Sequence, residues 1–189
     1  MNRAWQWTFA PPRDAWYGPP GPPDEFVTLV DVAGWRARTQ ADERIFTFLV
    51  EGEYEGGHLT YRELDGRSRA IAAELQARNA QGERVLLLFS PGLDYVAAVF
   101  GCFYAGALAV PAYPPDPFRM HRTFPRLQAI CADAQAKFVL TSEEILAYAR
   151  GPIASLADLQ SLAVESIPAT GYRDWRPVSF GGEGIALIQ

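Results

Sequence analysis

The stretch Val85-Leu86-Leu87-Leu88-Phe89-Ser90-Pro91-Gly92 decides the fold. Its first five residues form a continuous apolar run, which is typical of a strand that is buried on both faces of a parallel sheet. Ser90 is a favoured N-cap residue and Pro91 suits the first helical position, so we expect a helix to follow directly. That helix continues to about Tyr104, and Ala105-Gly106 ends it. A buried strand leading into a helix is one unit of an α/β fold.

The chain repeats this strand–helix order further along. Leu108-Ala109-Val110-Pro111 predicts a short strand that its proline ends, and the loop Tyr113–Pro117 is too rich in proline for regular structure. Residues 122–134 have a helical pattern, Phe138–Thr141 predicts a third strand, and Ser142 can cap another helix. Short connections between alternating elements predict an α/β fold with a mainly parallel, doubly wound sheet and flanking helices.

Two capping boxes mark helix starts before this central region. Thr28 precedes Asp31 by three positions, and Thr60 precedes Glu63 by three, which is the spacing of reciprocal side-chain to backbone hydrogen bonds. We therefore expect one helix over residues 29–38 and a second helix that begins after Thr60.

A hairpin is expected between these helices. Arg44–Val50 is rich in β-branched and aromatic residues, which favours a strand. Glu51–Gly57 reads as a polar loop, and His58–Thr60 is expected to return as a paired strand.

The pattern weakens near the C-terminus. Ile153–Leu162 is interpreted as helical, Val164–Ile167 as a short strand, and Gly171–Gly184 as a loop. The apolar residues Ile185–Gln189 predict a last strand.

Residues 1–26 differ from the rest because they hold six prolines, which remove amide donors and oppose helix formation. We interpret them as a proline-rich leader, either a surface strap or a docking segment for a partner. Residues 27–189 are then expected to form one N-terminal subdomain of a larger AMP-binding domain.

The bulk composition limits the function classes. The chain has 189 residues, of which 49% are hydrophobic and 21% charged, with a formal net charge of -5. An acidic chain without a long basic run does not favour nucleic-acid binding. No apolar run is long enough to predict a membrane span, and the two cysteines are too few for a disulfide framework. We therefore expect a cytoplasmic protein.

The sequence has no recognisable catalytic constellation. His58 and His121 lack metal-ligand spacing, so both are interpreted as solvated. Asp65, near Glu63, and the pair Glu143-Glu144 are interpreted as ordinary solvated helix charges. The amides after Ser90-Pro91-Gly92 could hold an anion, although capping explains these residues better. We therefore assign no catalytic, cofactor-binding or metal-binding residue in this chain.

Several ordered motifs resemble one known family. Leu59-Thr60-Tyr61-Arg62-Glu63-Leu64 is similar to the first core motif of the acyl-adenylate-forming superfamily, and residues 104–111 are similar to its second. Tyr104 stands where that second motif usually has lysine. The loop Ala112-Tyr113-Pro114-Pro115 and the helix Arg126–Ala134 resemble fatty acyl-AMP ligases in particular.

This resemblance implies an enzyme of fatty acid and lipid metabolism. Its members use ATP and Mg²⁺ to convert a fatty acid to acyl-adenylate, and then transfer the acyl group to an acyl carrier protein. In the family, the loop that holds ATP phosphates follows a Leu-Gln strand end. Because the chain ends at Gln189, we expect it to be truncated before that loop, to bind no cofactor and to be inactive alone.

Two other classes remain open. One is an acyl-CoA synthetase or an amino-acid adenylation domain, and the other is a non-catalytic binding module that recruits a partner through its leader. A truncated sheet is also expected to expose apolar surface, so we expect the chain to self-associate. On the central helix, Phe100 is expected to be largely buried.

Overall fold

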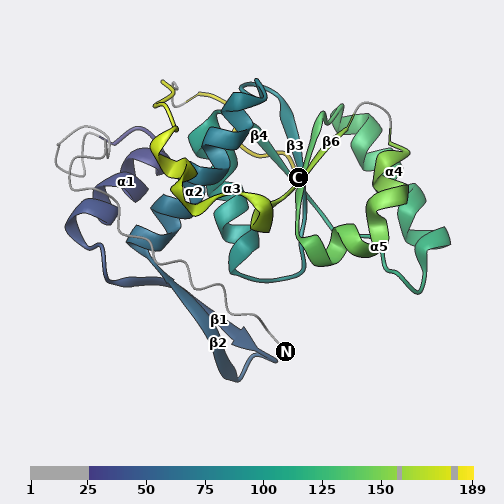
Figure 1. Ribbon diagram of the computed structural model, residues 1–189, viewed down its shortest axis with the longest axis horizontal. Coiled ribbons are helices and arrows are strands. Elements are labelled where there is room, and N and C mark those ends of the chain that lie inside the picture. Colours follow the sequence, from purple (N-terminus) through teal and green to yellow (C-terminus); the bar gives the residue numbers. More distant parts are fainter. Residues whose placement is uncertain (1–25, 157–158, 180–182) are drawn as a thin grey trace.

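The computed structural model describes residues 26–156, 159–179 and 183–189, so all but the last residue of the predicted leader lies outside the described residues. Within them, four strands form a parallel sheet in the order β4-β3-β5-β6, and helices cover both faces (Figure 1). The strands are β3 (Arg84–Leu88), β4 (Leu108–Ala112), β5 (Phe138–Thr141) and β6 (Gln160–Ala163). The predicted α/β fold with a parallel, doubly wound sheet is confirmed.

The helices are α1 (Leu29–Thr39), α2 (Tyr61–Ala77), α3 (Leu93–Ala105), α4 (Met120–Ala134) and α5 (Glu143–Ala154), with the short 3-10 helices η2 (Val164–Ser166) and η3 (Ala169–Arg173). Three of the helices, α1, α2 and α5, begin directly after the cap residues that the sequence predicts. The Thr28 and Thr60 hydroxyls each accept from the backbone amide three residues ahead, at 3.2 Å. Both capping boxes are complete, and Ser142 caps α5 in the same way.

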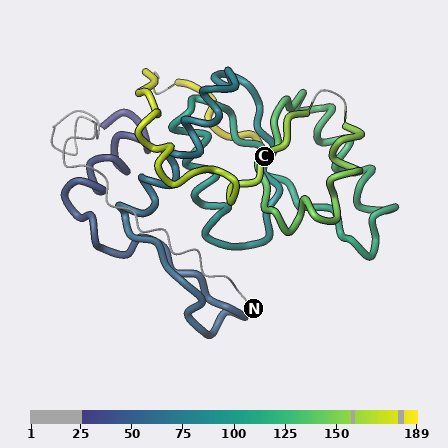
Figure 2. Tube along the Cα trace, viewed as in Figure 1, coloured from purple at the N-terminus to yellow at the C-terminus, as the bar shows by residue number. Residues whose placement is uncertain are grey.

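The expected hairpin forms a separate two-stranded sheet. Strand β1 (Arg44–Val50) pairs antiparallel with β2 (Tyr54–Thr60), and the hairpin projects away from the body of the molecule (Figure 2). The loop is shorter than predicted, because Tyr54 already pairs with Val50. Glu51 and Gly52 both have positive φ values, of 54° and 77°. Two consecutive left-handed residues allow a tight turn, which leaves Tyr54–Gly57 free to join the strand.

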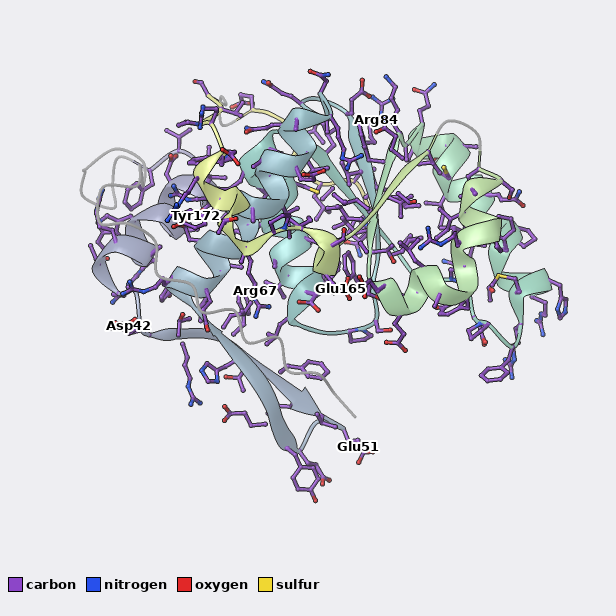
Figure 3. The ribbon with its side chains drawn as sticks, in the orientation of Figure 1. Asp42, Glu51, Arg67, Arg84, Glu165 and Tyr172 are labelled. Atoms are coloured by element: carbon purple, nitrogen blue, oxygen red, sulfur yellow. The ribbon has the colours of Figure 1, made fainter. Side chains whose placement is uncertain are left out.

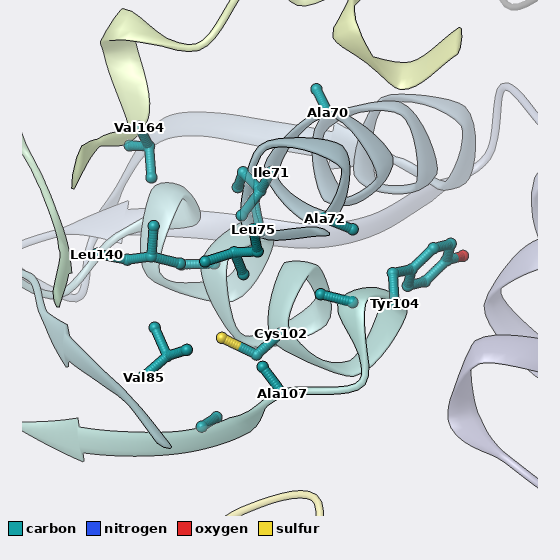
Figure 4. Packing of buried hydrophobic residues seen from close by; sticks show 14 of the residues in the cluster. Ala70, Ile71, Ala72, Leu75, Val85, Cys102, Tyr104, Ala107, Leu140 and Val164 are labelled. Atoms are coloured by element: carbon teal, nitrogen blue, oxygen red, sulfur yellow. The ribbon is translucent and has the colours of Figure 1, made fainter. Parts of the chain in front are cut away.

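Successive residues of β3 face opposite sides of the central sheet. Val85 and Leu87 belong to the core beneath α2 and α3, which we call the α2–α3 face (Figure 4). Leu86 and Leu88 belong to the core beneath α4 and α5, the α4–α5 face. The alternation follows from the period of two residues in a strand, and it explains why the whole run Val85–Leu88 is apolar.

Helix α3 packs closely on α2 through a glycine. A Cβ atom at Gly101 would lie 2.5 Å from Cγ2 of Ile71, so a larger residue has no room there. Cys102 and Tyr104 are fully buried next to it. Phe100 is only half-buried, and its ring packs on Phe103 with the centroids 5.8 Å apart. Phe100 packs against the core but is buried less completely than Cys102, because α3 turns its small residues toward α2, so the prediction of a largely buried Phe100 is confirmed in part.

The prediction that Pro111 ends the second strand is wrong. The Leu108 amide donates to the carbonyl of Glu83, the residue before β3. The Ala109 amide donates to the carbonyl of Ala186, on the other side of β4. Alternate amides of β4 therefore face opposite neighbours. Pro111 lies two residues after Ala109, so its nitrogen faces away from β3. A proline there removes no hydrogen bond of the β3–β4 ladder, and the strand continues to Ala112.

Four further predictions need correction. Gly92, rather than Ser90, is the N-cap of α3, and that end of the helix has no side-chain cap among the described residues. Residues 160–163 form a strand where a helix was expected, and residues 164–166 form a 3-10 helix where a strand was expected. The expected strand Ile185–Gln189 makes a single bridge, between Leu187 and Ala109, within the described residues. Residues 160–163 contain no β-branched or aromatic residue, so their pairing with β5, rather than local preference, decided their structure.

Candidate functional site

The carboxyl edge of the sheet is the first place to look for a site. The chain leaves β3 to form β4 on one side, and then crosses over to form β5 on the other side of β3. The topology therefore changes direction between β3 and β5. In open α/β sheets, ligands bind in the crevice outside the carboxyl ends of the strands at such a switch point. Here that crevice lies beyond Leu88 and Thr141.

The two strand ends at the switch point are tied together. The Thr141 hydroxyl donates to the Leu88 carbonyl at 2.7 Å, and both residues are buried. Immediately afterwards, Ser142 caps α5 and the Glu143 amide donates to the Glu165 carboxylate at 3.1 Å. This edge is consequently a fixed frame, in which the Thr141 side chain satisfies the Leu88 carbonyl at the end of β3.

A small cavity with charged walls lies at this edge. It has a volume of about 20 Å³ and is lined by Arg67 from α2, Asp94 from α3 and Glu165 from η2, together with apolar side chains. Figure 3 shows Arg67 and Glu165 at the same side of the molecule, opposite Arg84 at the amino edge. The guanidinium of Arg67 lies 3.3 Å from the Asp94 carboxylate. A volume of this size accommodates about one water molecule, so this cavity is too small for a nucleotide or a fatty acid.

Burial shifts the ionisation of these groups. It lowers the pKa of Arg67, against the opposing effect of Asp94 and Glu63. Burial also raises the pKa of Glu165, and the nearby Asp94 and Glu143 add to the rise. Raised carboxyl pKa values at a strand edge are characteristic of functional sites, although structural networks produce them as well.

The most unusual group of side chains was not visible as a site in the sequence. Asp65 is 1% exposed, and its carboxylate lies 2.9 Å from the guanidinium of Arg69 one turn later. The Tyr104 hydroxyl donates to the same carboxylate at 2.7 Å. The indole of Trp175 donates to the Tyr104 carbonyl at 2.9 Å, and the Arg69 guanidinium lies 4.5 Å from the Trp175 ring centroid. We call these four residues the Asp65 network.

The interpretation of Asp65 as a solvated charge is therefore wrong. Burial raises the pKa of Asp65, while Arg69 and the Tyr104 hydroxyl oppose the rise. Burial and the Asp65 charge raise the pKa of Tyr104, so its hydroxyl stays protonated and donates. The signal in the sequence was an Asp–Arg pair at i,i+4 on the apolar side of a helix, since the buried residues Leu64 and Ser68 flank it.

Tyr104 occupies the position where the second core motif of the acyl-adenylate-forming superfamily usually has lysine. The Asp65 network explains how a tyrosine is accommodated there. Its ring packs on Trp175 with the centroids 5.3 Å apart. The hydroxyl and the carbonyl of the same residue bind α2 and the segment after η3, respectively. Tyr104 thus joins three segments that are far apart in sequence.

A larger apolar groove lies at the opposite, amino edge of the sheet. Its volume is about 400 Å³. The lining residues come from the start of α1, the α3–β4 turn and the segment after residue 183, and include Val27, Leu29, Phe103, Leu108 and Ile185. The groove is remote from the switch point, so the two features are distinct.

The histidines lie apart from both cavities. His58 is on the hairpin, with Nδ1 3.4 Å from the Glu55 carboxylate, and His121 is exposed on α4. Among the described residues, no three His, Cys, Asp or Glu side chains are grouped as a metal site would require. Every helix in the same ranges is too short or too polar to cross a bilayer.

Comparison with known proteins then places the chain. Residues 34–177 match the family of AMP-binding enzymes. The chain belongs to this family. It is 39% identical over 169 residues to JamA of Moorena producens, a medium-chain fatty acid–acyl carrier protein ligase, a match that covers 87% of this chain and 28% of JamA. It is 33% identical over 126 residues to FadD32 of Mycolicibacterium smegmatis, a long-chain fatty acid–AMP ligase, covering 65% of this chain and 19% of FadD32.

A solved structure agrees with these relatives. The fold superposes with a TM-score of 0.76 on the fatty acyl-adenylate ligase of Legionella pneumophila in complex with acyl adenylate and pyrophosphate. The sequences are 35% identical, and the match covers 87% of this chain and 28% of the Legionella chain. The resemblance to fatty acyl-AMP ligases within the AMP-binding family is confirmed, and this chain spans 28% of the length of JamA.

Proposed function

We propose that this AMP-binding chain is the N-terminal part of a fatty acyl-AMP ligase. The reaction joins a fatty acid to the AMP part of ATP with release of pyrophosphate, and then transfers the acyl group to an acyl carrier protein. The observation that carries the proposal is the match to the Legionella enzyme, because that structure holds acyl adenylate and pyrophosphate, the two products of the first step. The similarity to JamA supports a carrier protein as acceptor.

ATP and Mg²⁺ would bind largely outside this chain. The cavity at the switch point has a volume of about 20 Å³, far below that of a nucleotide. The carboxylates of Asp94 and Glu165 line it together with Arg67, whose charge opposes a bound cation. The residues that line this cavity therefore do not fit a nucleotide–magnesium site, and no step of the reaction is assigned to them.

In this proposal the chain serves as a frame. Residues 27–189 form the first subdomain, and residues 1–26 form a leader before it. The carboxyl edge around Leu88, Thr141 and Glu165 would support the residues that hold substrate in the rest of the protein. Cys102 and Cys131 are buried free thiols, which supports a reducing, cytoplasmic location.

The complete protein provides the test. Incubated with a fatty acid, ATP and Mg²⁺, it should accumulate acyl-adenylate, detected by mass spectrometry, and should transfer the acyl group to a holo acyl carrier protein. Formation of acyl-CoA as the main product would instead identify an acyl-CoA synthetase. Activation of amino acids, or of no carboxylic acid, would exclude the proposal.

The 189-residue chain alone gives a second test. Millimolar ATP and Mg²⁺ should leave its melting temperature unchanged, because any ligand that binds the native state must stabilise it. A clear upward shift would show that the chain binds nucleotide without the remainder.

A further inference from the structure

The start of α4 carries an unusual group of exposed side chains. Arg119 is its N-cap, and Arg122 and Arg126 follow on the next turns, all three exposed. Phe118 is 94% exposed and Tyr113 is 86% exposed on the loop that leads into the helix. We call these five residues the α4 arginine surface. These two aromatics are the most exposed large hydrophobic side chains of the described residues.

The loop that presents these aromatics is held in place. The Asp116 carboxylate accepts from the Phe118 amide at 2.8 Å, and the Thr123 hydroxyl accepts from the Asp116 amide at 3.0 Å. The same hydroxyl lies 3.2 Å from the Arg119 carbonyl, to which it donates. Phe118 is therefore presented outward by a hydrogen-bonded turn, which lowers the entropy that a binding partner must overcome.

The arginines lie where they oppose the stability of the helix. The positive end of a helix dipole is at its N-terminus, so cations there are unfavourable. The other four α-helices of the described ranges have a carboxylate in the first turn, whereas α4 has none. Arg122 and Arg126 are also four residues apart, where like charges repel. Helix stability does not explain this arrangement.

The charges are also not neutralised nearby. No ion pair formed among the described residues includes Arg119, Arg122 or Arg126. The chain as a whole has a formal net charge of -5, so this surface is a local cationic patch on an acidic molecule. Such a patch attracts an anionic partner and directs it to one place.

The location of the surface indicates which partner fits. Helix α4 follows the carboxyl end of β4, so the patch borders the same edge of the sheet as the switch point (Figure 1). We propose that the α4 arginine surface docks the acyl carrier protein, an inference that rests on the proposed function. The arginines would contact the phosphodiester of its phosphopantetheine arm and carboxylates beside it, and the exposed rings would cover the apolar part of the contact. A membrane is a less suitable partner, since the acidic remainder of the chain would be repelled by anionic lipid.

The test compares two double charge reversals in the complete protein. R122E/R126E changes the patch, and R38E/R150E changes two arginines that are exposed elsewhere, on α1 and α5. The R122E change places a carboxylate in the first turn of α4, so the melting temperature should not fall. We expect R122E/R126E to raise the KM for holo acyl carrier protein by about tenfold or more at low salt, with acyl-adenylate formation within about twofold of wild type. R38E/R150E should leave both the KM for holo acyl carrier protein and acyl-adenylate formation unchanged. Added salt should raise the wild-type KM for the carrier protein.

Each of the other outcomes would contradict a specific part of the docking proposal or of the proposed function. An unchanged KM with normal acyl-adenylate formation would exclude docking at this surface. Loss of acyl-adenylate formation in R122E/R126E alone would show that the patch packs inside the complete protein. Binding of wild type, but not R122E/R126E, to vesicles of phosphatidylglycerol, with no change in the KM, would identify a membrane surface instead. Absence of acyl-adenylate in the wild type would contradict the proposed function.

In that case, the fluorescence anisotropy of a labelled holo carrier protein still tests docking. Equal affinity of the carrier protein for wild type and for R122E/R126E would exclude docking at this surface.

Discussion

The α2–α3 face of the sheet buries a charged network, whereas the α4–α5 face is covered mainly by aliphatic side chains. Among the described residues, the buried charged side chains are Asp65 and Arg69, and both lie on α2. The α4–α5 core consists of residues such as Leu86, Leu127 and Ile145. One face of the sheet is therefore covered with the help of a buried ion pair, and the other mainly by aliphatic packing.

The difference has a physical consequence. Aliphatic packing is non-directional, so it tolerates repacking of similar volume. A buried ion pair with a tyrosine donor is directional and tolerates little change, because each group needs its partner in place. We infer that the Asp65 network holds the segment around Trp175 in one position against α2 and α3, and that the α4–α5 face has no equivalent requirement.

Removal of the carboxylate should have the largest effect on this comparison. Asp65→Ala takes away the buried partner of the Arg69 guanidinium, so it is expected to lower the free energy of unfolding by about 3–5 kcal/mol. Urea unfolding followed by tryptophan fluorescence measures the change. The matched control is Asp133→Ala on the exposed side of α4, with an expected change below about 0.5 kcal/mol. Similar values for the two variants would remove the distinction between the faces.

The close approach of α2 and α3 should be nearly as sensitive. Gly101→Ala places a methyl group against Ile71, and overpacking of this kind costs about 1–3 kcal/mol. In an Ile71→Ala background, which removes the nearest contacting atom, the same change should cost less. An equal cost in both backgrounds, measured by urea unfolding, would mean that the clash with Ile71 is not its cause.

Two hydroxyl deletions compare the faces at the level of single hydrogen bonds. Tyr104→Phe removes a bond to a charged acceptor, with an expected cost of about 1.5–3 kcal/mol. Thr141→Val removes a bond to the neutral Leu88 carbonyl, with an expected cost of about 0.5–1.5 kcal/mol. Thermal unfolding of both variants ranks the two losses of stability. A larger loss for Thr141→Val would contradict the interpretation that the bond to the charged Asp65 is the stronger one.

Thiol reactivity should reveal the smallest difference. Burial raises the pKa of Cys102 on the α2–α3 face and, at a less enclosed position, that of Cys131 on the α4–α5 face. The thiolate is the reactive form, so both should react slowly with a disulfide reagent at pH 8, and Cys131 should react first. A Cys131→Ser variant should retain only the slower phase. Rapid labelling of that variant in its native state would show that Cys102 is accessible.

Local patterns predicted a large part of the fold. The capping boxes at Thr28 and Thr60 set the starts of two helices, since their hydrogen bonds join residues three positions apart. The run Val85–Leu88 predicted a strand buried on both sides. Each of these signals is contained within a few residues, so no knowledge of distant contacts was needed.

Other features depended on contacts that sequence spacing does not reveal. Pro111 lies within a strand because its nitrogen faces away from the β3–β4 ladder. Residues 160–163 form β6 because the edge of β5 was available for pairing. The interpretation of Asp65 as a solvated charge failed for the same reason, since its donor Tyr104 is 39 residues away.

The sequence by itself determined the α/β class, most helix starts and the membership of the AMP-binding family, because these follow from short-range periodicity, capping and ordered motifs. Only the tertiary structure decided which charges are buried, which face each strand residue covers, and that the α4 arginines border the carboxyl edge. Burial and proximity are properties of segments brought together from distant parts of the chain, and local physical preferences do not specify them.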